Sequence, residues 1–238
     1  DLLEKHPDKV PDMVACRVNA SLLKIELGSE AQARRLLAAA DVIAPSETPS
    51  SYFVTRGIAD ALMAARAGDF ERASRLFGQS RERATRRNRG NRAYELSIVA
   101  VHASLLRDSG RTHEAERLLR SVLPASDAPR RIGEEEFPIA LALTELLIAG
   151  ATDVDLARAL LRTLVSEALP ACDAETRWRI LSATADLAAA AGRNGSAVYF
   201  GKLAVLEAAG SLASFPPNAH QRDAILARRE TPALVLLR

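Results

Sequence analysis

The 238-residue chain has few of the residues that mark disulfide-rich, metal-binding or membrane proteins. Its two cysteines, Cys16 and Cys172, provide neither a disulfide framework nor a C-x-x-C metal site. No apolar run approaches the ~20 residues that a helix needs to cross a bilayer. Aromatic residues make up only 4% of the chain, and the β-branched and aromatic types that favour strands are sparse. These absences exclude a disulfide scaffold and argue against a sheet.

Charge is nearly balanced, with 32 basic and 30 acidic residues and a formal net charge of +2. Such a balance gives no global field that would attract nucleic acid or a membrane surface, so neither is expected as a partner. Two unpaired thiols fit a reducing compartment, and a cytoplasmic location is therefore predicted. The chain begins at Asp1 rather than Met and stops inside the apolar stretch 233–237, so we expect a fragment of a longer protein.

The apolar residues that are present favour helices. Hydrophobic residues make up 48% of the chain, and most of them are Ala and Leu. Both are strong helix formers. Composition therefore predicts an all-α fold with a substantial core.

Glycines recur at a nearly constant spacing along the chain. Five of them each follow a helical run, and an alanine five to seven residues later lies in a second helical run. The glycines are Gly28, Gly68, Gly110, Gly150 and Gly192, and the alanines are Ala33, Ala73, Ala115, Ala157 and Ala197. Successive glycines are 40 or 42 residues apart. This regularity, in a chain with 12 glycines, indicates a repeated supersecondary unit.

Each residue of the recurring pattern has a physical role. Gly at the end of the first helix adopts the left-handed conformation that reverses the chain. Asp, Thr or Ser in the polar stretch that follows caps the second helix. The Ala, together with a small residue seven before the Gly, lets the two helices approach closely. Those small residues are Ser21, Ala61, Ala103 and Ala185, and the larger core residues four after the Ala are Leu37, Phe77, Leu119 and Leu161, with Gly201 in the fifth repeat.

The sequence therefore predicts about five helical hairpins and a partial sixth repeat within one domain, residues 1–238. Proline-rich connectors separate them, because proline cannot donate a backbone hydrogen bond. The predicted hairpins are 10–44, 52–88, 92–124, 135–169 and 175–209, and the partial repeat is 218–238.

The stretch Gly-Asp-Phe-Glu-Arg-Ala at 68–73 resembles the turn and second helix of tetratricopeptide (TPR) repeats, as does Ser-Glu-Ala-Gln-Ala at 29–33. The repeat is longer than the usual 34 residues and lacks the usual aromatic in its first helix. The resemblance implies a right-handed α-solenoid in which first helices line a concave groove. It also implies a protein–protein interaction scaffold rather than an enzyme.

A narrower resemblance lies at 196–205, Ser-Ala-Val-Tyr-Phe-Gly-Lys-Leu-Ala-Val. It is similar to a stretch in bacterial TPR proteins that carry a caspase-like CHAT protease domain. This likeness implies a regulatory or sensing segment of a larger bacterial protein. The alternative is a peptide or small-ligand sensor of a TPR-containing transcription regulator.

Reactive side chains form no recognisable catalytic set in the sequence. His102 and Cys16 fall inside first helices and are interpreted as core or half-buried residues, whereas His113 is expected at the surface of a polar turn. His6 and His220 are likewise expected to be solvated. No H-E-x-x-H, P-loop or Rossmann pattern occurs, so no catalytic residue, metal site or cofactor is predicted.

Projection of the first helices at 3.6 residues per turn gives candidates for the partner-binding groove. The candidates lie two, three or six residues before a repeat glycine, and some of them lie one helical turn earlier. The candidates are Leu62, Arg66, Ser104, Arg107, Asp108, Thr144, Arg179, Ser182 and Asp186, with Ala65, Leu147 and Ile148 beside them. Arg66, Arg107 and Arg179 would share one channel, and guanidinium groups bind carboxylates well, so the partner is predicted to be a protein or peptide with acidic groups. The alternative is that these arginines pair with nearby carboxylates such as Asp108 and Asp186.

The densest charge feature is a run of arginines near the end of the second hairpin. Read as a site, it would contact phosphate or an acidic partner. Read as structure, it is the cation enrichment that the helix dipole favours at a C-terminus, and it lacks the interleaved aromatics of a single-strand binder. Its members are Arg81, Arg83, Arg86, Arg87, Arg89 and Arg92.

Overall fold

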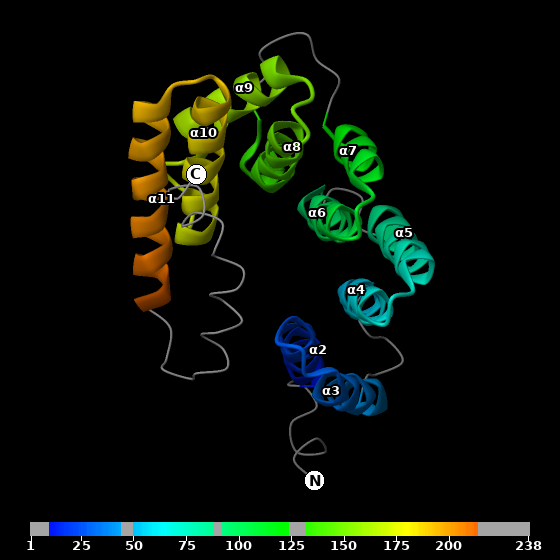
Figure 1. The fold of residues 1–238 in the computed structure, drawn as a ribbon. Helices are drawn as coiled ribbons and strands as arrows, with labels where there is room; N and C mark the ends of the chain where they lie inside the picture. The colour runs from blue at the N-terminus through cyan, green and yellow to red at the C-terminus, as the bar shows by residue number, and fades with distance from the viewer. Residues whose placement is uncertain (1–9, 44–49, 88–91, 124–131, 214–238) are drawn as a thin grey trace. The chain divides into compact units, whose positions relative to one another are not determined.

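A computed structural model describes residues 10–43, 50–87, 92–123 and 132–213, and every regular element in these ranges is a helix (Figure 1). The chain forms two compact units, Asp1–Leu105 and Leu106–Arg238, with the boundary inside one helix. None of the helices in the described ranges is long and apolar enough to cross a membrane.

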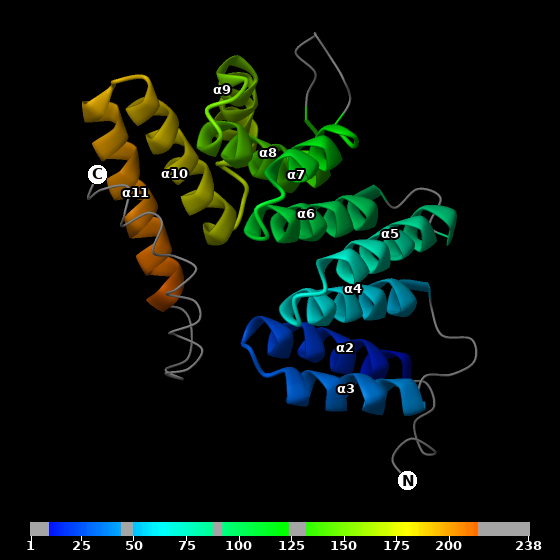
Figure 2. The same ribbon diagram turned by 45° about the vertical axis from the view of Figure 1, so that its right-hand side comes forward.

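The first unit contains two complete hairpins and most of a further first helix. Helix α2 pairs with α3, and α4 pairs with α5, side by side in Figures 1 and 2. Helix α2 also packs on α4, so the first helices of the two hairpins are in contact. The bounds are α2 Val10–Glu26, α3 Glu30–Ile43, α4 Ser50–Arg66, α5 Phe70–Arg87 and α6 Arg92–Asp108.

The second unit begins in the last turn of α6 and continues with α7 and two more hairpins. Helix α8 packs on α9, α10 packs on α11, and α8 also contacts α10. The bounds are α7 Thr112–Arg120, the 3₁₀ turn η2 Glu134–Glu136, α8 Phe137–Ala149, α9 Val154–Thr163, the π-helical turn η3 Leu164–Ala168, α10 Ala174–Ala190 and α11 Asn194–Ala213. The prediction of an all-α fold built from five hairpins is confirmed. The partial repeat 218–238 lies outside the described residues, and the single domain 1–238 stays a prediction.

Four of the five repeat glycines adopt the left-handed conformation predicted for them. Their φ angles lie between 70° and 81° at Gly28, Gly68, Gly110 and Gly192. The residue after each of these glycines donates its N–H to the carbonyl five residues back, as Asp69 does to Ala64 at 2.9 Å. This is the Schellman pattern that satisfies the orphan carbonyls of a helix end.

The prediction for Gly150 is wrong, because its φ is −82° and its conformation is right-handed. Ala151, with φ 49°, takes the left-handed place directly after the helix, and Asp153, with φ 44°, is left-handed as well. The Schellman hydrogen bond shifts by one residue as well. Its donor is the N–H of Thr152 rather than that of Ala151, and its acceptor is the carbonyl of Leu147, at 3.0 Å. The fourth hairpin therefore turns one residue later than its glycine indicates.

Some of the second helices have a side-chain N-cap, and one of them does not. Asp69 accepts the N–H of Arg72 at 3.0 Å, and Asp153 accepts that of Leu156 at 3.3 Å, as predicted for polar residues in these turns. In the third hairpin the N-cap position is Arg111 rather than Thr112, and its side chain makes no capping hydrogen bond. Its first turn instead carries an ion pair, because Arg111 donates to both carboxylate oxygens of Glu114 at 2.7 Å.

Small residues lie where the paired helices meet, as predicted. The repeat alanines Ala33, Ala73, Ala115, Ala157 and Ala197 are all buried, and so are Ser21, Ala61, Ala103 and Ala185 on the facing first helices. The larger residues four positions after the alanines, Leu37, Phe77, Leu119 and Leu161, are also buried. The core of each hairpin is therefore a narrow seam flanked by larger side chains.

Candidate protein-interaction face

The first helices of the second unit bring oppositely charged side chains together at the surface. Arg179 on α10 makes two hydrogen bonds to the Glu145 carboxylate on α8, Nε to Oε1 at 2.9 Å and Nη2 to Oε2 at 2.7 Å. This two-pronged geometry is the strongest form of an arginine–carboxylate pair. About a third of the Arg179 side chain and a quarter of the Glu145 side chain remain exposed, at 32% and 23%.

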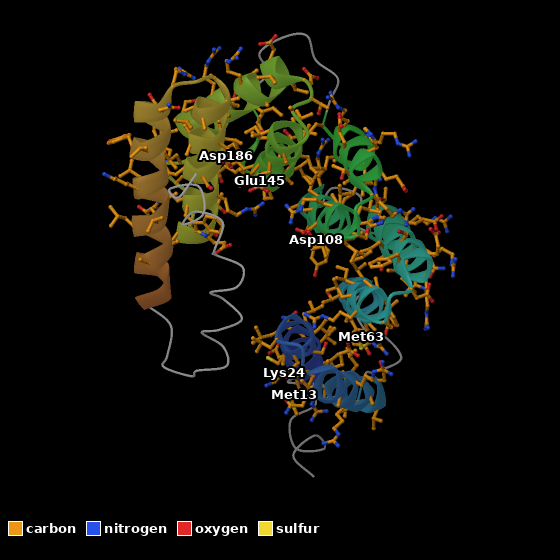
Figure 3. All side chains as sticks on the ribbon, viewed as in Figure 1. Met13, Lys24, Met63, Asp108, Glu145 and Asp186 are labelled. Carbon is orange, nitrogen blue, oxygen red and sulfur yellow. The ribbon has the colours of Figure 1, made fainter. Side chains whose placement is uncertain are left out.

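Arg107, in the last turn of α6, reaches the same carboxylate. Its Nη1 lies 3.6 Å from Oε2 of Glu145, and its Nε donates to Oδ1 of Asp108 at 3.1 Å. Figure 3 labels Asp108, Glu145 and Asp186, one on each of three successive first helices of this unit. Glu145 thus pairs with arginines from the first helices of the preceding and following hairpins, α6 and α10. We call Arg107, Glu145 and Arg179 the clamp.

The charges around the clamp keep Arg179 protonated. Burial alone would lower the pKa of Arg179, but the charge and hydrogen bonds of Glu145 outweigh it, and the pKa is raised. The carboxylates of Glu175 and Asp173 act in the same direction. Arg179 therefore stays ionised, and salt should weaken the clamp because its members are partly solvated.

Four of the predicted groove residues, Ala65, Thr144, Leu147 and Ser182, are buried, and those predictions are wrong. Ala65 is 7% exposed and Leu147 is 0% exposed. Thr144 is 0% exposed and donates to the Ala140 carbonyl at 2.7 Å. Ser182 is 5% exposed. Thr144 was placed by counting from Gly150, but the turn is centred on Ala151. Counted from Ala151, Thr144 occupies the small position seven before the turn.

The same correction explains the clamp. Counted from Ala151, the groove position six residues before the turn is Glu145, which lies about 100° around α8 from the buried Thr144. Sequence reasoning missed this residue, because an alanine in the left-handed conformation leaves no glycine signal. The longer loop is visible only in the spacing from glycine to alanine, which is seven residues from Gly150 to Ala157 and five residues in the other four repeats.

The remaining groove candidates divide between the units. In the first unit Arg66 and Ser104 are exposed, and Leu62 is half-buried among core residues. A Cβ added to Gly28 would lie 3.6 Å from Nη1 of Arg66, so this guanidinium covers the first turn. In the second unit Arg107 and Asp108 are exposed, and Asp186 is half-buried. Of the three arginines predicted to share a channel, Arg107 and Arg179 meet at Glu145.

Internal pairing also neutralises part of the predicted basic patch. Arg81 donates to Glu95 at 2.9 Å, and Arg86 donates to Glu82 at 2.6 Å. Arg83 and Arg92 are exposed. The side chain of Arg87 and the whole of Arg89 lie outside what the structure describes. The paired members behave as a solvated helix surface, in line with the structural interpretation of this run.

Potentially reactive groups are scattered. Cys16 is exposed, which corrects the prediction of a core residue, since it lies about 200° around α2 from the buried Val14. Burial raises the pKa of the Cys172 thiol, which lowers its thiolate fraction. His102 is half-buried as predicted, stacked on Phe77 at 4.9 Å between ring centroids and 3.1 Å from Ser74 Oγ. His113 is exposed as predicted, and the described residues contain no group of His, Cys, Asp or Glu that could hold a metal.

A set of hydrogen bonds and ion pairs between α3 and α4, which we call the tie, was not predicted. The Tyr52 hydroxyl donates to Asp41, and Arg56 pairs with both Asp60 and Asp41, the latter at 3.3 Å. Burial, followed by the Asp41 hydrogen bond, raises the pKa of Tyr52 to about 12. The tie joins the second helix of one hairpin to the first helix of the next, and so stabilises their stacking.

The raised pKa of Tyr52 predicts a change in stability at alkaline pH. The neutral phenol stabilises the fold fully below pH ~10, and this contribution is lost as pH rises through ~12. Tyr52→Phe should cost about 1 kcal/mol near neutral pH, because it removes one hydrogen bond. The variant should also lose less stability than the parent between pH 8 and pH 11. Urea unfolding at both pH values measures this, and equal pH dependence would contradict the assignment.

Comparison with known proteins gives a likeness of fold. No protein-family model matches the sequence, and no curated protein matches it significantly. The structure is similar to the crystal structure of BtubC (BKLC) from P. vanneervenii, with a TM-score of 0.61. The match covers 91% of this chain and 87% of that chain at 15% sequence identity. At this identity the similarity concerns the fold alone.

Proposed function

We propose that the chain is a TPR-like protein–protein interaction scaffold. In this proposal it is the regulatory or sensing segment of a larger cytoplasmic bacterial protein, such as a TPR-CHAT protease. The observation that carries the proposal is the clamp. Three successive first helices of the second unit contribute Arg107, Glu145 and Arg179 to one surface network, and each side chain is 23–41% exposed.

The chemistry of the clamp lets a charged group of a partner protein replace one of the clamp's own charged groups. A partner carboxylate can replace Glu145 against the forks of Arg107 and Arg179, because the geometry and charge are those that the arginines already hold. A partner guanidinium or ammonium can instead replace an arginine against Glu145. Since the clamp is already neutralised internally, binding requires competition with Glu145. This favours a peptide that makes several contacts over a single small anion.

Reversal of one clamp charge should weaken partner binding. Arg107→Glu places a carboxylate beside Glu145, and we expect affinity for a captured partner to fall about tenfold, consistent with loss of a partly exposed interfacial charge. Arg162→Glu is the matched control, because Arg162 lies exposed on the second helix α9 and should leave affinity unchanged. Affinity capture followed by cross-linking mass spectrometry identifies the partner and the helices that it contacts, and titration measures both variants.

The result that supports the proposal is a stoichiometric partner cross-linked to α8 and α10 whose affinity falls only in Arg107→Glu. Cross-links confined to α9 and α11, or equal affinity of both variants, would remove the clamp from the binding surface. The nature of the captured partner also separates a peptide bearing carboxylates from one bearing basic side chains.

A further inference from the structure

Helix α11 exposes large apolar side chains to solvent. Three of the eight exposed large hydrophobic residues in the described part of the chain lie on this helix, and two of them, Tyr199 and Leu206, are 60% and 67% exposed. The third is Val198. Helix α10 packs along one side of α11, where Ala197 and Ala204 are buried (Figures 1 and 2). Tyr199 and Leu206 lie about 180° around the helix from Ala197, so they face away from α10.

The outer face of α11 differs from that of the other second helices. Tyr199 and Lys202 lie two and five residues after the repeat alanine Ala197. In each of the other four second helices, an exposed arginine occupies one of these two positions. These arginines are Arg35, Arg75, Arg117 and Arg162. The repeat therefore does not require apolar residues there, and the exposed apolar face is a property of α11 itself.

The exposed residues of α11 follow a heptad spacing. Five of them are separated by four, three, four and three positions. They are Gly195, Tyr199, Lys202, Leu206 and Ala209, which we call the stripe. Alternating steps of three and four residues align side chains along one line of a helix, on which a second helix packs. The stripe therefore has the geometry of one half of a two-helix interface.

The single charge in the stripe determines which helix can pack on it. Lys202 is exposed, and it forms no ion pair with another described residue. Glu207, the one acidic residue of α11, pairs instead with Arg177 of α10 at 3.4 Å. A cation covered by an apolar helix would be costly unless a carboxylate lay opposite it. The helix that covers the stripe is therefore expected to carry Glu or Asp at that point.

A second copy of the chain does not meet this requirement. In an antiparallel pair of α11 helices, Tyr199 of one copy meets Leu206 of the other, and this register places the two Lys202 side chains next to each other. In a parallel pair the two lysines face each other directly. Like charges in contact oppose association. The charge of the stripe therefore favours a different protein over a second copy.

We propose that the stripe of α11 is a docking surface for one amphipathic helix of another protein, and that this helix carries a carboxylate opposite Lys202. Tyr199 and Leu206 supply the apolar contact, and Lys202 fixes the register, as a single polar residue does in a coiled coil. The stripe lies on a second helix, whereas the first helices form the clamp. The inference therefore goes beyond the proposed function and does not depend on it.

Two labelled synthetic peptides test the proposal on the whole chain. Both carry leucine at the a and d positions of a heptad repeat, except at one central d position that is Glu in the first peptide and Lys in the second. Fluorescence anisotropy measures binding of each peptide. We expect the Glu peptide to bind the parent about tenfold more tightly than the Lys peptide, and Lys202→Glu to reverse this preference. Leu206→Glu should weaken binding of the Glu peptide about tenfold or more, because it removes apolar contact area.

Arg162→Glu is the matched control, because Arg162 is exposed at the position of α9 that corresponds to Lys202 and should not affect either peptide. The emission of Trp178, the only tryptophan of the chain, checks that each variant remains folded. Equal binding of the two peptides, no binding of either, or an unchanged preference in Lys202→Glu would overturn the proposal. So would a dimer of the parent in analytical ultracentrifugation that Leu206→Glu dissociates, because the stripe would then bind a second copy.

Discussion

Phe77→Ala should destabilise the first unit by roughly 3–5 kcal/mol, the range for truncating a fully buried aromatic side chain. Phe77 is 0% exposed, four residues after the repeat alanine Ala73, and it packs in a cluster with Val54, Ala61 and Ile98. It also stacks on His102. The truncation therefore leaves a cavity where two hairpins meet. Urea unfolding followed by circular dichroism measures the loss.

Phe70→Ala is the matched control, because Phe70 begins the same helix and is 36% exposed. We expect this variant to lose about 1 kcal/mol or less, as is usual for a surface position. Similar losses for the two phenylalanines would contradict the assignment of the α5 face that packs against α4 and α6.

Thr144→Glu should destabilise the second unit by roughly 3 kcal/mol or more. Thr144 is fully buried at the small position of α8, and a carboxylate there would be buried without a partner. The emission of Trp178 follows unfolding of this unit directly. The expected result is a large drop in the urea midpoint.

Ala149→Glu tests whether any new charge on α8 has the same effect. Ala149 is exposed at the end of the helix, so the variant should stay within about 0.5 kcal/mol of the parent. A stable Thr144→Glu variant would mean that residue 144 faces solvent, as counting from Gly150 predicts. It would remove the assignment of Ala151 as the centre of the turn.

Much of the fold could be predicted from the sequence, because its repeat signals are local and physical. Gly68 and Gly110 are left-handed because only glycine adopts that conformation without strain, and the spacing between them fixes the hairpin length. Ala73 and Ala115 are buried because two helices approach closely there. These signals act within a few residues of each turn, so the weak family resemblance did not matter for them.

The candidate site was harder to predict, because it depends on rotation about a helix axis. One residue of slip in a turn rotates every side chain of the preceding helix by about 100°, which is enough to exchange the buried Thr144 with the partly exposed Glu145. The slip at Ala151 costs strain for a non-glycine residue. Nothing in the local sequence signals it except the longer spacing to Ala157.

Pairings between helices were also beyond the sequence. Arg107 and Arg179 were predicted to share a surface, but Glu145, the residue that joins them, was not predicted. The tie of Tyr52 to Asp41 depends on how one hairpin stacks on the next, and periodicity within a helix does not report this. Sequence therefore predicts which helices form more reliably than which of their side chains meet.

Thiol labelling at two adjacent positions tests the central assignment most directly. In a chain with Cys16→Ser and Cys172→Ser, Thr144→Cys and Glu145→Cys each place one thiol on neighbouring residues of α8. If the turn is centred on Ala151, the thiol at 145 reacts rapidly with a maleimide. The thiol at 144 reacts at about a hundredth of that rate or more slowly, because it becomes accessible only when the helices separate. Equal rates, or faster reaction at 144, would show that α8 presents the other face and that the clamp does not form.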